Sequence, residues 1–152
     1  MQTLKAGDKV PHFTATDENG NTISLSDYAG KRLIVFFYPK ANTEGCTAEA
    51  CNLRDNYAEL QARGYRLLGV SADSVRKQSN FRKKYNFPFP LLADVDHTVI
   101  DAFGVWGPKK FMGREYDGIH RMTFLVDGKG VVAHVIDKVN TKDHAAQLLE
   151  LM

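Results

Sequence analysis

The chain has 152 residues, 43% hydrophobic and 25% charged, with a formal net charge of +2, so a globular fold needs neither a disulfide nor a metal to hold it together. The small net charge gives no reason to expect a nucleic acid or an anionic membrane as partner. No apolar run has the length of a signal-peptide core or a membrane span, and we therefore expect one cytoplasmic domain over residues 1–152.

The first half of the sequence predicts a hairpin and then alternating buried strands and helices. The expected elements are, in chain order, a β-hairpin over 12–25 with its turn at 17–20, a strand over 33–38, a helix from position 46 or just before to about 64, a strand over 65–71 and a helix over about 75–85. The strand over 33–38 is entirely apolar and aromatic and is closed by Pro39, which favours a buried position. Asp73 and Ser74 form a capping signal for the helix that follows them.

The second half begins with a helix break at Pro88 and Pro90 and ends with a hairpin and a helix. We expect a short edge strand over 91–93, a short helix over 98–103, a structured loop over 104–118, paired strands over 122–126 and 131–136 around a turn at 127–130, and a closing helix capped by Thr141 that extends to 151. Without the N-terminal hairpin extension, this order is that of the thioredoxin-like α/β fold, a mixed central sheet flanked by helices. In that fold the helix after the first buried strand carries the redox site.

One of the two cysteines, Cys46, follows the strand over 33–38 after a connection rich in turn-forming residues. At a helix start, the unpaired backbone N–H groups and the positive end of the helix dipole favour a thiolate. Free cysteines are more commonly small buried apolar residues. The position of Cys46 after a Gly-, Pro- and Thr-containing loop favours a nucleophile instead.

The second cysteine, Cys51, lies five positions after Cys46. On one regular helix this spacing gives a Cα–Cα distance of about 8–9 Å, whereas a disulfide needs no more than about 7 Å. The two can therefore bond only if the first turn or two of the helix unwinds, and helix starts open at low free-energy cost. A cysteine inside a helix also has a structural interpretation as part of the core, which stays open for Cys51.

Two residues of the connecting loop have both structural and functional interpretations. Pro39 ends strand pairing and fixes the turn. Thr43, three positions before Cys46, is either a helix cap or turn former or a hydroxyl that accepts from a local N–H and donates to an oxygen substrate. The sequence does not separate these roles, and one residue can serve both.

Arg121 stands at the start of the apolar strand over 122–126. It is either a solvated strand end or, if it points to the end of the sheet where Cys46 emerges, a charge that favours the thiolate and stabilises a leaving oxygen. Glu49 lies three positions after Cys46 on the same helix face. It is either a favourable acid in the first turn or a partner that orients the arginine.

Together these residues resemble the peroxiredoxins, whose signature is Pro-x-x-x-Thr-x-x-Cys and is matched by Pro39, Thr43 and Cys46. The similarity points to the bacterioferritin comigratory protein, or peroxiredoxin Q, subfamily and extends over segments 38–41, 45–47, 50–51, 53–55, 103–107, 118–121 and 124–125. The resemblance implies a peroxidatic Cys46, a resolving Cys51, and a peroxide pocket made by Thr43, Pro39 and Arg121. One departure is Glu44, where this subfamily often has proline, and we expect it to loosen the loop and to place a negative charge near the thiolate.

The mechanism implied by the resemblance is attack of the Cys46 thiolate on the O–O bond of a peroxide, which gives a sulfenic acid. Cys51 then forms an intramolecular disulfide with it, and thioredoxin or a similar dithiol reductant restores both thiols. The resemblance implies no metal, haem, flavin or other cofactor. Because one chain holds both cysteines, we expect a monomer.

Two other functions are weighed against a peroxidase. A thiol–disulfide oxidoreductase on the same fold would normally carry Cys-x-x-Cys, but residue 49 is Glu. A metal-binding or redox-sensing protein would combine both cysteines with some of the five histidines, which show no ligand spacing and are interpreted as surface or loop residues: His12, His97, His120, His134 and His144. Peroxide preference would depend on the pocket around Trp106 and Phe111, two aromatic residues that are more commonly part of loop packing.

Overall fold

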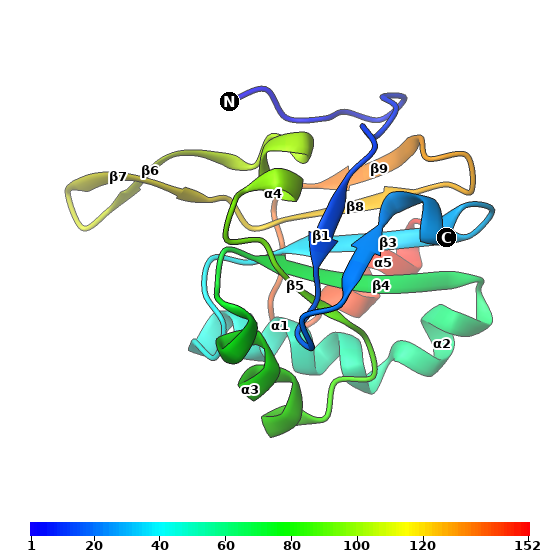
Figure 1. Cartoon of the computed structure of the whole chain (residues 1–152), viewed down its shortest axis with the longest axis horizontal. Helices are drawn as coiled ribbons and strands as arrows, with labels where there is room; N and C mark the ends of the chain where they lie inside the picture. Colours follow the sequence, from blue (N-terminus) through cyan, green and yellow to red (C-terminus); the bar gives the residue numbers. More distant parts are fainter.

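The computed structural model describes residues 1–152, and its centre is a five-stranded mixed sheet in the order β5-β4-β3-β8-β9 (Figure 1). The five strands are β3 (Arg32–Phe37), β4 (Tyr65–Ser71), β5 (Leu91–Ala93), β8 (Met122–Val126) and β9 (Val132–Ile136). β3, β4 and β5 run parallel, whereas β8 is antiparallel to both of its neighbours. The mixed sheet of a thioredoxin-like fold is confirmed.

Helices cover the two faces of this sheet (Figure 1). They are α1 (Glu44–Asp55), α2 (Tyr57–Ala62), α3 (Val75–Tyr85), α4 (Thr98–Phe103) and α5 (His144–Glu150), and a short 3-10 helix, η1 (Leu25–Tyr28), precedes β3. Alternate residues of β3 point to opposite sides. Ile34 and Phe36 pack with residues of α1, α2, α3 and α5, while Val35 and Phe37 pack with α4. Both faces are therefore apolar and buried, as the unbroken apolar run predicts.

Two separate hairpins accompany the central sheet. The N-terminal hairpin, β1 (Thr14–Thr16) with β2 (Thr22–Ser24), confirms the expected extension. The structured loop expected over 104–118 is wrong, because β6 (Trp106–Phe111) and β7 (Arg114–Ile119) form a long hairpin that projects from the body of the molecule (Figure 1). Its turn is Met112-Gly113, with φ angles of 52° and 78°. Such turns are normally signalled by Asn-Gly or Asp-Gly, so the Met-Gly pair concealed this one.

Two helix boundaries differ from the sequence prediction. The helix expected to end near Gly64 is divided at Asn56, where the backbone leaves the helical conformation with φ −111° and ψ 9°. The closing helix begins at His144 with Asp143 before it, so Thr141 is not its cap. The predicted strand over 65–71 and the helices over 75–85 and 98–103 are confirmed, and Ser74 accepts a hydrogen bond from the Lys77 N–H as the predicted cap.

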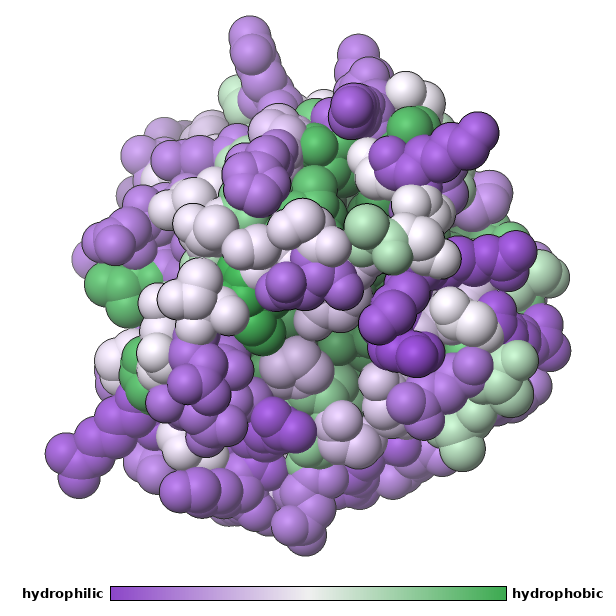
Figure 2. Space-filling model, turned by 45° about the vertical axis from the view of Figure 1, so that its right-hand side comes forward, coloured by the Kyte–Doolittle hydropathy of each residue, from purple (hydrophilic) through white to green (hydrophobic).

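The molecule has no helix with both the length and the apolar character needed to traverse a bilayer. Figure 2 shows a face that is mostly hydrophilic, with apolar side chains visible between charged ones.

Gly104 fixes the N-terminal segment onto the end of α4. Its φ is +71°, and a Cβ at this position would overlap the backbone carbonyl of Gln2. The same segment is held by a Thr3 hydroxyl that donates to the Gly104 C=O at 2.6 Å and by the Leu4 N–H that donates to the Phe103 C=O at 3.0 Å. The backbone of residues 2–4 thus approaches the end of α4 more closely than a side chain at position 104 would allow.

We expect Gly104→Ala to lower the free energy of unfolding by about 1–3 kcal/mol more than the matched change Gly113→Ala. Gly113 has a similar φ of +78° but nothing within 4 Å of its Cβ position, so the difference isolates the overlap from the backbone strain. Chemical denaturation of the three proteins measures it. Equal losses in both variants would contradict the close packing of the N-terminal segment.

Candidate active site

The loop between β3 and α1 carries Cys46 away from the end of the central strand. Asp73, which follows β4, holds this loop: its Oδ2 accepts hydrogen bonds from the Ala41 N–H and from the Ser71 hydroxyl, both at 2.7 Å. α1 then begins at Glu44, with Thr43 as the residue before it. The loop is therefore anchored by a neighbouring strand end, which fixes where the helix starts.

Cys46 is the third residue of α1 and is only 1% exposed. The first helical hydrogen bond runs from the Thr47 N–H to the Thr43 C=O at 2.8 Å, so the N–H groups of positions 44–46 precede the helical ladder. Glu44, at the first helical position, is exposed. Proline fits that position without losing a helical bond, so the helix geometry is compatible with either residue.

The Thr43 hydroxyl does not cap the helix. It donates to the Lys40 C=O at 2.8 Å, and no side-chain capping bond is made. Thr43 therefore stands at the cap position predicted from the sequence, but its side chain makes no capping hydrogen bond. Its oxygen keeps its lone pairs, and the residue is exposed at the mouth of the loop. Pro39 is half-buried directly after β3.

Arg121, 75 positions after Cys46, reaches the thiol: its Nη2 donates to the Cys46 Sγ at 3.2 Å. Its Nη1 donates to the Glu49 Oε1 at 2.8 Å, so one guanidinium joins the sulfur to the carboxylate. The arginine side chain is 22% exposed. Of the two interpretations from the sequence, the geometry is that of an arginine aimed at Cys46 and oriented by Glu49.

Glu49 is fully buried, and burial raises its pKa to about 7 against the opposing pull of Arg121. Its second oxygen, Oε2, is buried and has no hydrogen-bond partner. Because the pKa is 4.5 for an ordinary glutamate and higher in the folded protein, ionisation of Glu49 weakens the fold as the pH rises from 4.5 to about 7. The buried position of Glu49 therefore favours the protonated form of its carboxyl group.

Both cysteines are free thiols within the continuous helix α1. Cys51 is half-buried, and burial raises its pKa. The single-helix geometry assumed from the sequence is therefore present, and its spacing keeps the two sulfurs from bonding while the helix is intact.

A cation that the sequence did not single out, Lys109, lies near this cluster. Its Nζ donates to the Ile119 C=O at 2.8 Å, and burial together with the charge of Arg121 lowers its pKa. Lys109 and Arg121 line a groove of about 1,110 Å³ with Lys5, Lys138 and residues of the N-terminal segment. Nothing in the spacing of Lys109 signals this, because it depends on how the β6–β7 hairpin returns to the sheet.

The two aromatic residues proposed for the substrate pocket lie elsewhere. Trp106 is 37% exposed and packs on the ring of His97, with the centroids 4.5 Å apart. Phe111 is 65% exposed, next to the tip of the hairpin. The structure does not bring either side chain into the cluster of Cys46, Arg121 and Glu49.

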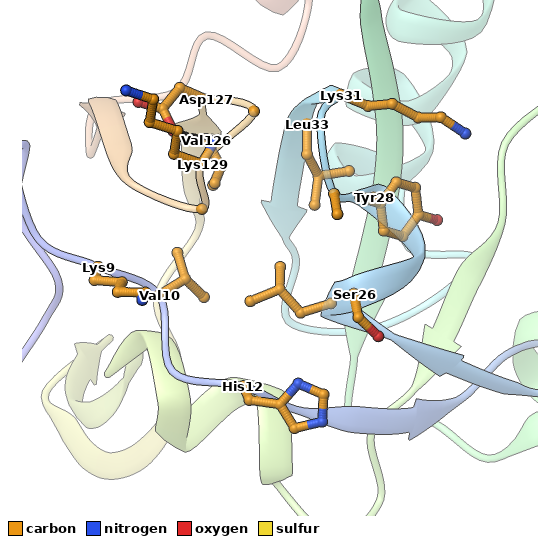
Figure 3. Close-up of a pocket in the computed structure, with 14 residues that line it drawn as sticks. Lys9, Val10, His12, Ser26, Tyr28, Lys31, Leu33, Val126, Asp127 and Lys129 are labelled. Carbon is orange, nitrogen blue, oxygen red and sulfur yellow. Dashed lines mark hydrogen bonds between the residues drawn. The ribbon is translucent and has the colours of Figure 1, made fainter.

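A second pocket, of about 370 Å³, lies at the end of the sheet where β3 begins, away from the end that delivers Cys46 (Figure 3). It contains no cysteine, and Val10, His12 and Leu33 are among its lining residues. The five histidines do not gather with cysteine or acidic side chains into a group that could hold a metal ion. His144, interpreted as a surface or loop residue, is instead fully buried in α5.

Comparison with known proteins finds similar chains over most of this sequence. A family model for the AhpC/TSA family matches residues 6–135. Peroxiredoxin Bcp of Escherichia coli strain K12 is 50% identical over 144 residues, which cover 95% of this chain and 92% of that protein, and peroxiredoxin Bcp of Bacillus subtilis strain 168 is 43% identical over 150 residues, which cover 99% and 96%. A solved structure of the Xanthomonas campestris bacterioferritin comigratory protein superposes with a TM-score of 0.85 at 36% identity, over 91% of this chain and 88% of that one.

Proposed function

The chain belongs to the AhpC/TSA family and is a thiol peroxidase of the Bcp peroxiredoxin type, and on that premise we propose that Cys46 is its peroxidatic cysteine. The observation that carries this assignment is the contact of Arg121 Nη2 with Cys46 Sγ at 3.2 Å, at the start of a helix. A positive guanidinium and free backbone N–H groups both favour the thiolate, which is the nucleophilic form. Cys51 lies deeper in the helix, past the unpaired N–H groups of its start, and burial raises the pKa of its thiol against the opposing charge of Arg54.

The first step is attack of the Cys46 thiolate on one peroxide oxygen. A sulfur–oxygen bond forms with an electron pair of the sulfur, the O–O bond breaks, and the departing oxygen takes up a proton to leave as water or an alcohol. Arg121 is placed to stabilise the negative charge that develops on that oxygen. The Thr43 hydroxyl can donate to the bound peroxide once its hydrogen rotates away from the Lys40 C=O. Pro39, directly after β3, forms another part of the proposed peroxide pocket.

The second step joins Cys46 and Cys51. The Cys51 sulfur displaces water from the Cys46 sulfenic acid after the first turns of α1 unwind, and the product is an intramolecular disulfide. A dithiol reductant, which we take to be thioredoxin, then restores both thiols. We also propose that residues 1–152 act as one domain in the cytoplasm. A monomer is sufficient for the cycle, since both cysteines lie on one helix of one chain.

Organic hydroperoxides join hydrogen peroxide as proposed substrates. The similar Xanthomonas campestris structure concerns the alkyl peroxide reduction activity of the bacterioferritin comigratory protein. In this chain the groove beside Arg121 is lined in part by apolar residues, Leu4, Met122 and Val139 among them, which can accept an alkyl group.

The test is mass spectrometry of the reduced protein after one equivalent of hydrogen peroxide. We expect the intact chain to lose two hydrogen atoms and a peptide digest to contain a bond between Cys46 and Cys51. The Cys46→Ser variant, treated alike, should keep its remaining thiol unmodified. Two free thiols in the wild-type protein after treatment, or a disulfide between two chains, would overturn the mechanism.

A further inference from the structure

His144 is a fully buried histidine on α5 that lies next to the second oxygen of the Glu49 carboxyl group. Its Nε2 lies 3.6 Å from the Glu49 Oε2 and 2.7 Å from the Thr123 hydroxyl. Its Nδ1 lies 2.7 Å from the Gln147 Oε1. The chain of contacts therefore runs from the sulfur through Arg121 and Glu49 to His144.

Backbone contacts fix which ring nitrogen of His144 carries the proton. The Gln147 Oε1 accepts from the Asn140 N–H at 2.9 Å, and the Gln147 Nε2 donates to the Lys138 C=O at 2.9 Å, so its amide can have only this orientation. The Nδ1 of His144 faces an acceptor and must donate to it. A neutral His144 then presents a lone pair at Nε2, to which the Thr123 hydroxyl donates.

This tautomer leaves the second oxygen of Glu49 without an N–H donor, which affects the protonation of its carboxyl group. Its Oε1 accepts from Arg121, but the buried Oε2 has no donor and lies 3.6 Å from the unprotonated Nε2 of His144. Nε2 accepts from the Thr123 hydroxyl but offers no N–H to Oε2, so the two acceptors 3.6 Å apart repel each other in this buried site, and a proton on Oε2 removes the repulsion. Burial favours the neutral form of both groups, since it raises the pKa of Glu49 and lowers that of His144.

We propose that His144 is a positioning residue whose Nε2 lone pair keeps Glu49 protonated, so that Arg121 directs its charge to the Cys46 sulfur. An ionised Glu49 would compete with the thiolate for the same guanidinium, whereas a protonated one still orients it through Oε1. This inference rests on the proposed role of Cys46 as the peroxidatic thiol. It predicts that the reaction with peroxide slows when Glu49 loses its proton.

The position of His144 is held by contacts between α5 and α1. The Asn52 Oδ1 accepts from the Ala145 N–H at 2.7 Å, and its Nδ2 donates to the Lys142 C=O at 3.3 Å. The titratable and charged groups that face Glu49 are Cys46 on its own helix, Arg121 before β8 and His144 on α5, with Lys109 of β6 next to Arg121. Burial raises the pKa of Glu49 to about 7, so this carboxyl group loses its proton within the neutral range.

The pH dependence of the peroxide reaction tests the proposal. The rate measured by stopped flow should fall about tenfold in the wild type between about pH 6 and about pH 8, with a midpoint near 7. A tenfold change is the effect of an electrostatic interaction that shifts a pKa by about one. The Glu49→Gln variant keeps an acceptor for Arg121 but cannot ionise, so its rate should not fall over this range, whatever its absolute value. His144→Asn should move the midpoint to lower pH, because Glu49 loses the lone pair that favours its protonated form.

His12→Asn is the matched control, since His12 is exposed and lines the distant pocket of Figure 3. Its profile should coincide with that of the wild type. A wild-type rate that does not fall, or a Glu49→Gln rate that falls equally, would overturn the proposal. If instead no variant and no wild-type protein oxidised Cys46, the proposed function would have failed.

A second measurement needs no variant. Nitrogen NMR shifts of the His144 ring in the reduced wild-type protein should show a protonated Nδ1 and an unprotonated Nε2 at about pH 6. An Nε2-protonated ring, or an imidazolium at that pH, would contradict the assignment of the proton to Glu49.

Discussion

Arg121→Ala is expected to slow the reaction of Cys46 with peroxide by about 10²–10³-fold, the usual cost of removing a donor that stabilises a developing oxyanion. The guanidinium contacts the sulfur at 3.2 Å and is 22% exposed, so water replaces it poorly. Its removal takes away both the charge that favours the thiolate and the donor for the leaving oxygen. Stopped-flow kinetics under single-turnover conditions measures the reaction of Cys46 separately from its recycling.

Two further variants separate charge from geometry. Arg121→Lys keeps a positive charge but cannot donate to Cys46 and Glu49 in parallel, so its rate should lie between those of the wild type and Arg121→Ala. Arg114→Ala removes an exposed arginine of the β6–β7 hairpin and should react at the wild-type rate. A rate for Arg121→Ala within threefold of the wild type would exclude the arginine from the transition state.

The loss predicted for Arg121→Ala does not require unfolding. The arginine lowers the pKa of Glu49, so without it Glu49 stays protonated to higher pH and no bare charge remains buried. We therefore expect the variant to unfold cooperatively and to retain its free thiols. Circular dichroism at the pH of the kinetic measurement checks this point.

The relation of Cys46 to its loop could be predicted from sequence because it is local. A closed apolar strand, turn residues and a helical period lie within about 15 positions, and local patterns of this kind carry the strongest signal. The Met-Gly turn of the long hairpin is equally local but lacks the usual residues, which is why the sequence predicts a loop there.

The contacts of the carboxyl group could not be predicted in the same way. Arg121 lies 72 positions from Glu49, and its direction follows from the antiparallel pairing of β3 with β8, in which Phe37 faces Met122. The sequence left two directions open for it. His144 is a further 23 positions along the chain and is buried by the docking of α5 on α1, so its isolated position in the sequence suggested an ordinary exposed histidine. Long-range packing decides both cases.

Cys51→Ser is expected to reduce turnover with a dithiol reductant to a single peroxide per chain. The first step needs only Cys46 and its partners, so one equivalent is still consumed. The sulfenic acid then has no thiol to condense with and persists or takes up further peroxide to the sulfinic acid. Coupled assays with thioredoxin measure the turnover, and mass spectrometry detects the added oxygen atoms on Cys46.

The state of Cys51 in the folded helix explains why the cycle has two separable stages. Burial raises its pKa, so inside α1 it is a protonated thiol and a poor nucleophile, and the helical spacing keeps its sulfur away from Cys46. Unwinding of the first turns removes both obstacles together, because it exposes the thiol and frees its position. Sustained turnover by Cys51→Ser at the wild-type rate would mean that the reductant attacks the Cys46 sulfenic acid directly, and the opening of α1 would then have no part in the cycle.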